Sequence, residues 1–179
     1  IPYGAGLGGG SADAAFMLVG LNRLFSLGLN EEQLMGYAAR LGSDCPFFVR
    51  NHPVFAFGKG ELMEAIDLSL KDYVMVLVKP DRGVSTPEAY RGITPRAASF
   101  DLRELGKLPV CEWNGVVVND FETSVIPKVP EIQEIKDTLN ALGAVYVSMT
   151  GSGSAVYGLF DRSVEVGETF PGYFVWKSK

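Results

Sequence analysis

Apolar residues recur at helical spacing near both ends of the chain and predict two amphipathic helices. The first runs from about residue 11, where Ser11 or a neighbour caps it, to about residue 25, and we expect it to be buried. Its apolar face consists of Ala14, Leu18, Leu21 and Phe25. The other helix follows Pro130 and ends before Gly143. Its core-facing residues are Ile132, Ile135, Leu139 and Leu142.

Two further helices are predicted from their end residues. Asn30 and Gln33 have the spacing of a capping box and open a helix over residues 31–41, which a glycine then ends. A short helix is expected to begin at Thr86, which could cap it, with Pro87 in its first turn. The stretch 91–113 shows little periodicity, so we expect it to be irregular.

Runs rich in β-branched and aromatic residues predict strands at 54–58, 73–78, 145–149 and 155–160. The run 73–78 is typical of a strand at the centre of a sheet. A tight glycine turn joins the last two strands. Strands alternate with helices, so the fold class is α+β. The polar stretch before residue 73 places a domain boundary near residue 66, giving domains 1–66 and 67–179.

Composition narrows the classes of protein that the chain can represent. Its 179 residues are 47% hydrophobic, which suffices for a core, and its net charge of −5 argues against a basic nucleic-acid surface. No apolar run approaches the ~20 residues of a membrane span. Cys45, Cys111 and the single His52 provide neither a disulfide framework nor a metal cluster. We expect a cytoplasmic protein without nucleic-acid or membrane partners, in which His52 is a solvated turn residue.

Five glycines lie between Gly4 and Gly10, directly before the first predicted helix. Glycine adopts positive φ and lets a ligand approach the backbone, so successive N–H groups can converge on an anion. The N-terminus of the helix adds its own amides and the positive end of its dipole. The pattern predicts a phosphate-binding loop, with a flexible linker as the alternative. Asp13 is expected to cap the helix rather than to contact a ligand.

The sequence patterns of two common phosphate-binding loops do not fit these residues. A Walker A loop ends in Gly-Lys-Ser/Thr, whereas Gly10 is followed by Ser11 and no lysine precedes Arg23. Gly4, Gly6 and Gly9 match the dinucleotide pattern, which requires a strand ending in an acidic residue near position 30. The capping box predicts a helix there instead. An NAD-dependent oxidoreductase therefore remains as an alternative that the secondary structure near residue 30 can decide.

Three separated segments together resemble the GHMP kinase superfamily, whose members phosphorylate small-molecule alcohols. Residues 2–12 resemble its ATP-binding loop, and residues 150–153 resemble its C-terminal glycine motif. Within the superfamily, the triple glycine before Ser11 and the segments 42–48 and 119–122 resemble the member that acts on a cytidyl diphospho sugar alcohol. The resemblance implies a two-domain fold: 1–66 would be the remainder of the N-terminal ATP-binding domain, and 67–179 a ferredoxin-like α/β C-terminal domain.

The resemblance also implies a reaction. ATP, with Mg²⁺, would phosphorylate the 2-hydroxyl of 4-diphosphocytidyl-2-C-methyl-D-erythritol in non-mevalonate isoprenoid biosynthesis. Asp44 matches the catalytic aspartate that accepts the proton of the attacking hydroxyl; from the residues alone, a helix N-cap beside Pro46 explains it better. No protein metal site is expected, although the Ser11 hydroxyl would lie near a phosphate or Mg²⁺. The residues that would bind ATP are Pro2, Tyr3, Gly4, Ala5, Gly6, Leu7, Gly8, Gly9, Gly10, Ser11 and Ala12.

On the substrate side, the matching positions have structural explanations as well. Thr86, Pro87 and Tyr90 match the cytidine end of the family's pocket, or they form a capped helix with a core tyrosine. Gly151 and Gly153 match a loop beside the rest of the substrate, but a hairpin turn needs glycine in any case. Lys59 matches only loosely. Residues 119–122 are expected to cap a helix, with no chemistry of their own.

The family's catalytic lysine lies upstream of the ATP loop and is absent from this sequence, as are residues that help to hold cytosine and adenine. We therefore expect the chain to be part of a longer protein, and to bind nucleotide poorly and not turn over by itself. Homoserine-type or mevalonate-type kinases and a non-catalytic nucleotide-binding module remain as alternatives. Both a monomer and a homodimer are compatible with the sequence.

Overall fold

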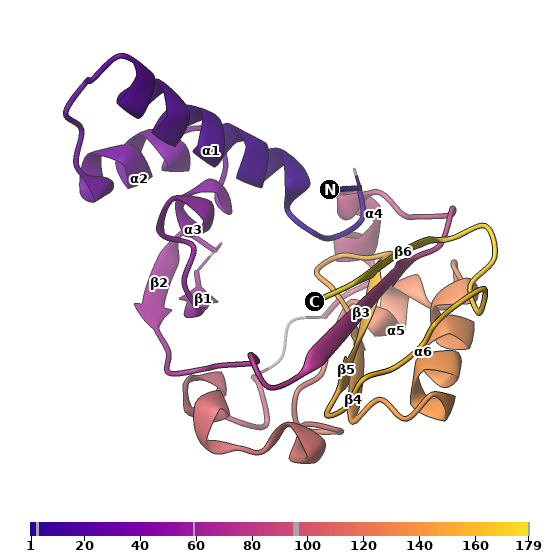
Figure 1. The fold of residues 1–179 in the computed structure, drawn as a ribbon. Coiled ribbons are helices and arrows are strands. Elements are labelled where there is room, and N and C mark those ends of the chain that lie inside the picture. Colours follow the sequence, from indigo (N-terminus) through magenta and orange to yellow (C-terminus); the bar gives the residue numbers. More distant parts are fainter. Residues whose placement is uncertain (3, 59, 95–96, 179) are drawn as a thin grey trace. The chain divides into compact units, whose positions relative to one another are not determined.

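The computed structural model describes residues 1–2, 4–58, 60–94 and 97–178. The chain divides into two compact units, whose elements are labelled in Figure 1. The first comprises Ile1, Gly8–Leu68 and Arg103–Gly106, and the second comprises Pro2–Leu7, Ser69–Leu102 and Lys107–Lys179. The glycine-rich loop is thus shared, because its first half packs within the second unit. The division into functional domains at residue 66 stays a prediction.

The first unit contains three α-helices, a β-hairpin and, in its segment Arg103–Gly106, most of a 3-10 helix. The α-helices and strands are α1 Gly9–Leu24, α2 Glu31–Ala39, α3 Cys45–Arg50, β1 Val54–Phe57 and β2 Leu62–Ala65. Both α1 and α2 pack against α3. The hairpin is antiparallel, with Val54 opposite Ala65. Strand β2 was not predicted, since it is too short to show a clear period. Helix α3 begins where the alternative interpretation of Asp44 as an N-cap beside Pro46 places a helix start.

Helix α1 differs from its prediction at its start and in its burial. Its N-cap is Gly8, with φ 63° and no side-chain cap, so neither Ser11 nor Asp13 caps it. The helix buries Ala12 and Ala15, whereas Leu21 is 38% and Phe25 64% exposed. The prediction of a buried leucine face is wrong, because the alanine face makes the close contacts with the rest of the unit.

The capping box that opens α2 is confirmed. Asn30 Oδ1 accepts the Gln33 N–H at 2.9 Å, and Gln33 Oε1 accepts the Asn30 N–H at 3.0 Å. Residues 31–39 are therefore helical where a dinucleotide fold would require a strand. This result excludes the oxidoreductase interpretation of the glycine loop.

The second unit is built on a four-stranded antiparallel sheet in the order β4-β5-β3-β6. The strands are β3 Val74–Lys79, β4 Tyr146–Met149, β5 Val156–Phe160 and β6 Phe174–Lys177. The central place of β3 and the β4-β5 hairpin are confirmed. The order is that of a ferredoxin-like sheet. Strand β6 was not predicted, because it is a short, largely exposed edge strand.

The connection between β3 and β4 carries the remaining helices of the described chain. They are α4 Thr86–Arg91, the 3-10 helices η1 Leu102–Lys107 and η2 Val110–Glu112, α5 Glu122–Val125 and α6 Glu131–Ala141. The two 3-10 helices lie in the stretch that was expected to be irregular. None of the helices in the described ranges is long and apolar enough to cross a membrane.

The core of the second unit lies between α6 and one face of the sheet. Ile132, Ile135 and Leu139 are buried, as predicted, and pack in one cluster with Val78 and Phe160. Because side chains alternate between the two faces of a strand, the neighbour of Val78, Leu77, lies on the opposite face. There it packs with Ala5 and Ala155. The first half of the glycine-rich loop is therefore held on the sheet face away from α6.

Candidate functional site

The glycine-rich loop has the backbone geometry of an anion-binding loop. Gly4, Gly6 and Gly8 have φ of 63°, 73° and 63°, whereas Ala5 and Leu7 between them do not have positive φ. Alternation of this kind turns successive N–H groups toward the same side of the chain. Among the predicted ATP-binding residues, Tyr3 lies outside the described residues.

The first half of this loop is joined to the glycine motif that follows β4. Thr150 Oγ1 donates a hydrogen bond of 2.9 Å to Gly6 O, and the Ala155 N–H donates to Ala5 O at 3.1 Å. A Cβ placed on Gly6 would lie 2.1 Å from Thr150 O, and one on Gly151 would lie 2.8 Å from Gly6 O. The first half of the glycine-rich loop and the second glycine motif, which are far apart in the sequence, thus pack directly against each other.

The second half of the loop leads into α1. The Ala12 N–H donates the first helical hydrogen bond, to Gly8 O at 2.8 Å. The amides of Gly9, Gly10 and Ser11 therefore precede the helical pattern and lack an acceptor within the helix. A Cβ on Gly10 would meet nothing within 4 Å. These amides are the groups by which a helix N-terminus binds phosphate.

Asp44 stands at the N-cap position of α3, but its side chain makes no cap hydrogen bond. Its carboxylate is exposed and accepts a hydrogen bond from Ser43 Oγ at 3.3 Å. The same helix carries Phe48, whose ring would lie 2.9 Å from a Cβ on Gly8. Helix α3 therefore brings Asp44 and the end of the glycine-rich loop into the same unit. A capping role does not account for the Asp44 carboxylate.

The predicted substrate-side residues of α4 lie beside the second glycine motif. The N-cap of α4 is Ser85 rather than Thr86, with Pro in the first turn as predicted. The Thr86 hydroxyl lies 3.4 Å from that of Ser152. Tyr90 is 63% exposed, so the interpretation as a core tyrosine is wrong. Its ring meets Phe121 edge-on at 4.8 Å between centroids.

Gly151 and Gly153 both need to be glycine in this turn. Their φ are 52° and 85°, and a Cβ on Gly153 would lie 2.7 Å from Met149 Sδ. These values fit the hairpin explanation, and the contact of Gly151 with Gly6 adds a second constraint. Lys59 lies outside the described residues, and His52 is exposed.

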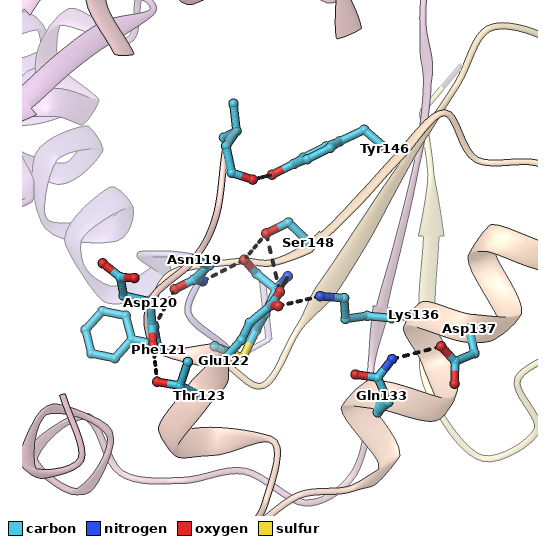
Figure 2. A network of polar contacts seen from close by, with 12 residues as sticks. Asn119, Asp120, Phe121, Glu122, Thr123, Gln133, Lys136, Asp137, Tyr146 and Ser148 are labelled. Carbon is cyan, nitrogen blue, oxygen red and sulfur yellow. Dashed lines mark hydrogen bonds and ion pairs between the residues drawn. The ribbon is translucent and has the colours of Figure 1, made fainter. Parts of the chain in front are cut away.

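Residues 119–122 lie at the start of a helix, as predicted, but no side chain caps it. The N-cap of α5 is Phe121, which makes no side-chain capping hydrogen bond. Asn119 Nδ2 instead donates to Met149 O at 2.7 Å and to Gly151 O at 2.9 Å. Figure 2 shows Asn119 and Glu122 beside Ser148, with Lys136 reaching Glu122. Lys136 was not singled out from the sequence, since no local pattern links it to Glu122.

Next to this network lies a small cavity of about 230 Å³. It is lined by the polar side chains of Asn114, Asn119, Lys136, Tyr146 and Ser148, among others. Burial raises the pKa of Tyr146, against the opposing effect of its hydrogen bonds to Ser148 and Tyr157. Burial likewise raises the pKa of Tyr157, and the neighbouring Tyr146 raises it further. Both phenols therefore stay protonated at neutral pH.

Comparison with known proteins identifies the family. The GHMP kinases N terminal domain matches residues 1–52, and the GHMP kinases C terminal domain matches residues 96–169. A crystal structure of 4-(cytidine 5'-diphospho)-2C-methyl-D-erythritol kinase is 34% identical with a TM-score of 0.73, covering 89% of this chain and 58% of that one. The chain belongs to the GHMP kinase family, and its α+β fold is that of this family.

Several similar relatives carry the name 4-diphosphocytidyl-2-C-methyl-D-erythritol kinase. The protein of this name from Parabacteroides distasonis is 53% identical over 100% of this chain and 67% of its own length. That from Bacteroides thetaiotaomicron is 54% identical over 94% of this chain and 62% of its length. The chain thus spans about two thirds of the length of these relatives or slightly less. Homoserine kinase from Cytophaga hutchinsonii, 18% identical with a TM-score of 0.62, shares the fold.

Proposed function

We propose that this chain forms the ATP-loop and C-terminal part of a kinase that phosphorylates the 2-hydroxyl of 4-diphosphocytidyl-2-C-methyl-D-erythritol. The observation that carries the proposal is the 53% identity, across the whole chain, to a relative of that name. The free cysteine thiols suit a cytoplasmic enzyme.

The nucleotide-binding role rests on the geometry of the glycine-rich loop. Alternate positive φ at Gly4, Gly6 and Gly8 and the amides at the start of α1 suit the phosphates of ATP. We assign Pro2 to Ala12 to this function. In the described ranges, no group of three or more His, Cys, Asp or Glu side chains could hold a metal ion. Mg²⁺ would be held mainly by the phosphates and water, with the Ser11 hydroxyl near a phosphate or the ion, and would neutralise phosphate charge.

Asp44 is proposed as the general base. Its exposed carboxylate accepts a hydrogen bond from the hydroxyl of the neighbouring Ser43, and this bond orients one of its oxygens. The other oxygen would accept the proton of the attacking hydroxyl. A base of this kind contributes roughly 10²- to 10⁴-fold to the rate. Replacement of Asp44 by Asn should therefore lower kcat by about that factor and leave KM for ATP nearly unchanged.

The acceptor side is proposed to include Thr86, Pro87 and Tyr90, together with Gly151 and Gly153. The exposed Tyr90 ring has one edge contact, with Phe121, and its face suits stacking on a cytosine base. The hydroxyl of Thr86 beside Ser152 suits a polar group of the acceptor.

The test is an ADP-release assay on the complete gene product that carries this chain. Three acceptors are compared: 4-diphosphocytidyl-2-C-methyl-D-erythritol, homoserine and mevalonate, with an acceptor-free control for ATP hydrolysis. We expect turnover with the cytidyl acceptor and loss of this turnover in the Asp44→Asn variant. Turnover with homoserine alone would contradict it. The 179-residue chain by itself is expected not to turn over, and normal turnover by it would overturn that expectation.

A further inference from the structure

The segment Asn119–Glu122 contacts the backbone at the outer edge of the sheet. Strand β4 is an edge strand, so its Met149 N–H and C=O have no neighbouring strand to bond on that side. Glu122 Oε1 accepts the Met149 N–H at 2.8 Å, and Asn119 Nδ2 donates to Met149 O at 2.7 Å. The two side chains thus replace the missing strand at one residue.

Met149 is the last residue of β4 before the second glycine motif. Asn119 Nδ2 also donates to Gly151 O at 2.9 Å, inside that motif, while its Oδ1 accepts the Phe121 N–H at 3.0 Å. One amide therefore uses both of its donors and one acceptor to hold the turn and its own backbone. Only asparagine or glutamine offers that combination, and glutamine is longer.

The charge of Glu122 is balanced inside the protein. Its Oε2 pairs with Lys136 Nζ from α6, and both side chains are less than 20% exposed, at 18% and 17%. A carboxylate in such a place is costly without a partner. The ion pair with Lys136 therefore fixes the Glu122 side chain where it accepts the Met149 N–H.

The contacts continue to the proposed ATP loop and acceptor site. Thr150 Oγ1 donates to Gly6 O, and the backbones of Gly6 and Thr150 are too close for a side chain at Gly6. On the other side, Phe121 contacts the ring of Tyr90. Residues 119–122 therefore touch elements assigned to both substrates, all within the second unit.

We propose that Asn119 and Glu122 are positioning residues that hold the Thr150–Gly153 turn, and through it Gly6, in the conformation that binds ATP. This inference rests on the proposed kinase function. In this role neither Asn119 nor Glu122 contacts a substrate, and each acts through the backbone of the turn. Lys136 supports Glu122 and has no direct part.

The test compares two asparagines that make the same kind of bond at opposite ends of β4. Asn114 Nδ2 donates to Val145 O at 2.9 Å, away from the glycine turn, so Asn114→Ala is a matched control for Asn119→Ala. Asn119→Asp keeps the acceptor for Phe121 but sets a carboxylate oxygen against the two carbonyls. Glu122→Gln keeps an acceptor for Met149, and Glu122→Ala does not.

Hydrogen exchange of the 149–155 peptide and steady-state kinetics are measured on the complete gene product. We expect Asn119→Ala and Asn119→Asp to speed exchange in that peptide, raise KM for ATP and lower kcat/KM by about tenfold, because both variants lose the hydrogen bonds to Met149 O and Gly151 O. Asn114→Ala should change neither quantity, and Glu122→Gln should retain most of the activity that Glu122→Ala loses.

Two results would overturn the inference: unchanged exchange in Asn119→Ala, or faster exchange with KM for ATP and kcat/KM as in the wild type. A purely structural role would lower the unfolding midpoint of the Asn119 and Asn114 variants alike without changing KM for ATP. Failure of the proposed function appears separately, as a wild-type protein that phosphorylates no acceptor. The exchange comparison then still decides whether Asn119 holds the turn.

Discussion

Substitution of Gly6 by alanine probes the junction between the two glycine motifs. The new Cβ would lie 2.1 Å from Thr150 O and 2.9 Å from the Gly153 N–H nitrogen, both backbone atoms. Backbone cannot rotate out of the way as a side chain can, so the two segments must separate. Gly4→Ala is the matched control, because Gly4 has a similar φ of 63° and no atom within 4 Å of its Cβ position.

The expected magnitudes follow from these contacts. Both variants bear the cost of a Cβ at positive φ, about 1–2 kcal/mol. Separation of the segments in Gly6→Ala also breaks the hydrogen bonds that join Thr150 Oγ1 to Gly6 O and the Ala155 N–H to Ala5 O. Each contributes about 0.5–1.5 kcal/mol, so Gly6→Ala should be less stable than Gly4→Ala by about 1–3 kcal/mol. The gain from a stiffer unfolded chain is common to both and cancels.

Urea unfolding followed by circular dichroism measures the two free energies of unfolding. The wild type and both variants are compared with a common m-value, the slope of the unfolding free energy against urea concentration, so that the midpoints report stability. Binding of a fluorescent ATP analogue to the complete gene product provides the functional readout, and Gly6→Ala should weaken it more than Gly4→Ala. Equal unfolding free energies for the two variants would refute the contact between Gly6 and Thr150 as the reason for glycine at that position.

Two further predictions concern the sheet and the helix that covers it. Leu139 is fully buried, so Leu139→Ala should lower the free energy of unfolding by about 2–5 kcal/mol. Leu142 is partly buried, so Leu142→Ala should lower it clearly less. Equal losses of stability in the two variants would contradict the assigned buried face of α6. Burial raises the pKa of Tyr157 above the 10.0 of an unburied phenol. Its contribution to stability is therefore complete below pH of about 10 and is lost as the pH rises further, by up to about 1.4 kcal/mol per pH unit. Tyr157→Phe should flatten the fall in urea midpoints above pH of about 10, and an unchanged slope would contradict the shift.

Elements that are specified locally could be predicted from the sequence. The capping box at Asn30 and Gln33 needs only a spacing of three residues, and the buried face of α6 follows from its period. The hairpin β4-β5 is marked by glycines that have positive φ in the structure. In each case the pattern that predicts the element lies within one short stretch of the chain.

Contacts between distant segments could not be predicted. Nothing in the sequence pairs Gly6 with Thr150, since each glycine motif has its own local explanation. Asparagine commonly caps helices, yet the side-chain amide of Asn119 donates to the backbone of an edge strand, and only the folded sheet shows which strand lies at the edge. The exposed side of α1 was misjudged because apolar spacing alone does not say which apolar face is covered.

We propose Asp44 as the general base because of its place in the structure and because it matches the catalytic aspartate of the GHMP kinases. The structure places it at the start of α3 without a capping bond, in the unit that contains Gly8 and α1. Its replacement by Asn should therefore affect the reaction rather than the fold.

Phosphorus NMR of the reaction products tests the central claim most directly. The complete gene product is incubated with ATP, Mg²⁺ and 4-diphosphocytidyl-2-C-methyl-D-erythritol, and the spectrum is followed with time. We predict one new phosphomonoester on the 2-hydroxyl of the acceptor, formed in step with ADP. Formation of ADP and inorganic phosphate with the acceptor unchanged, or phosphorylation at another hydroxyl, would contradict the claim.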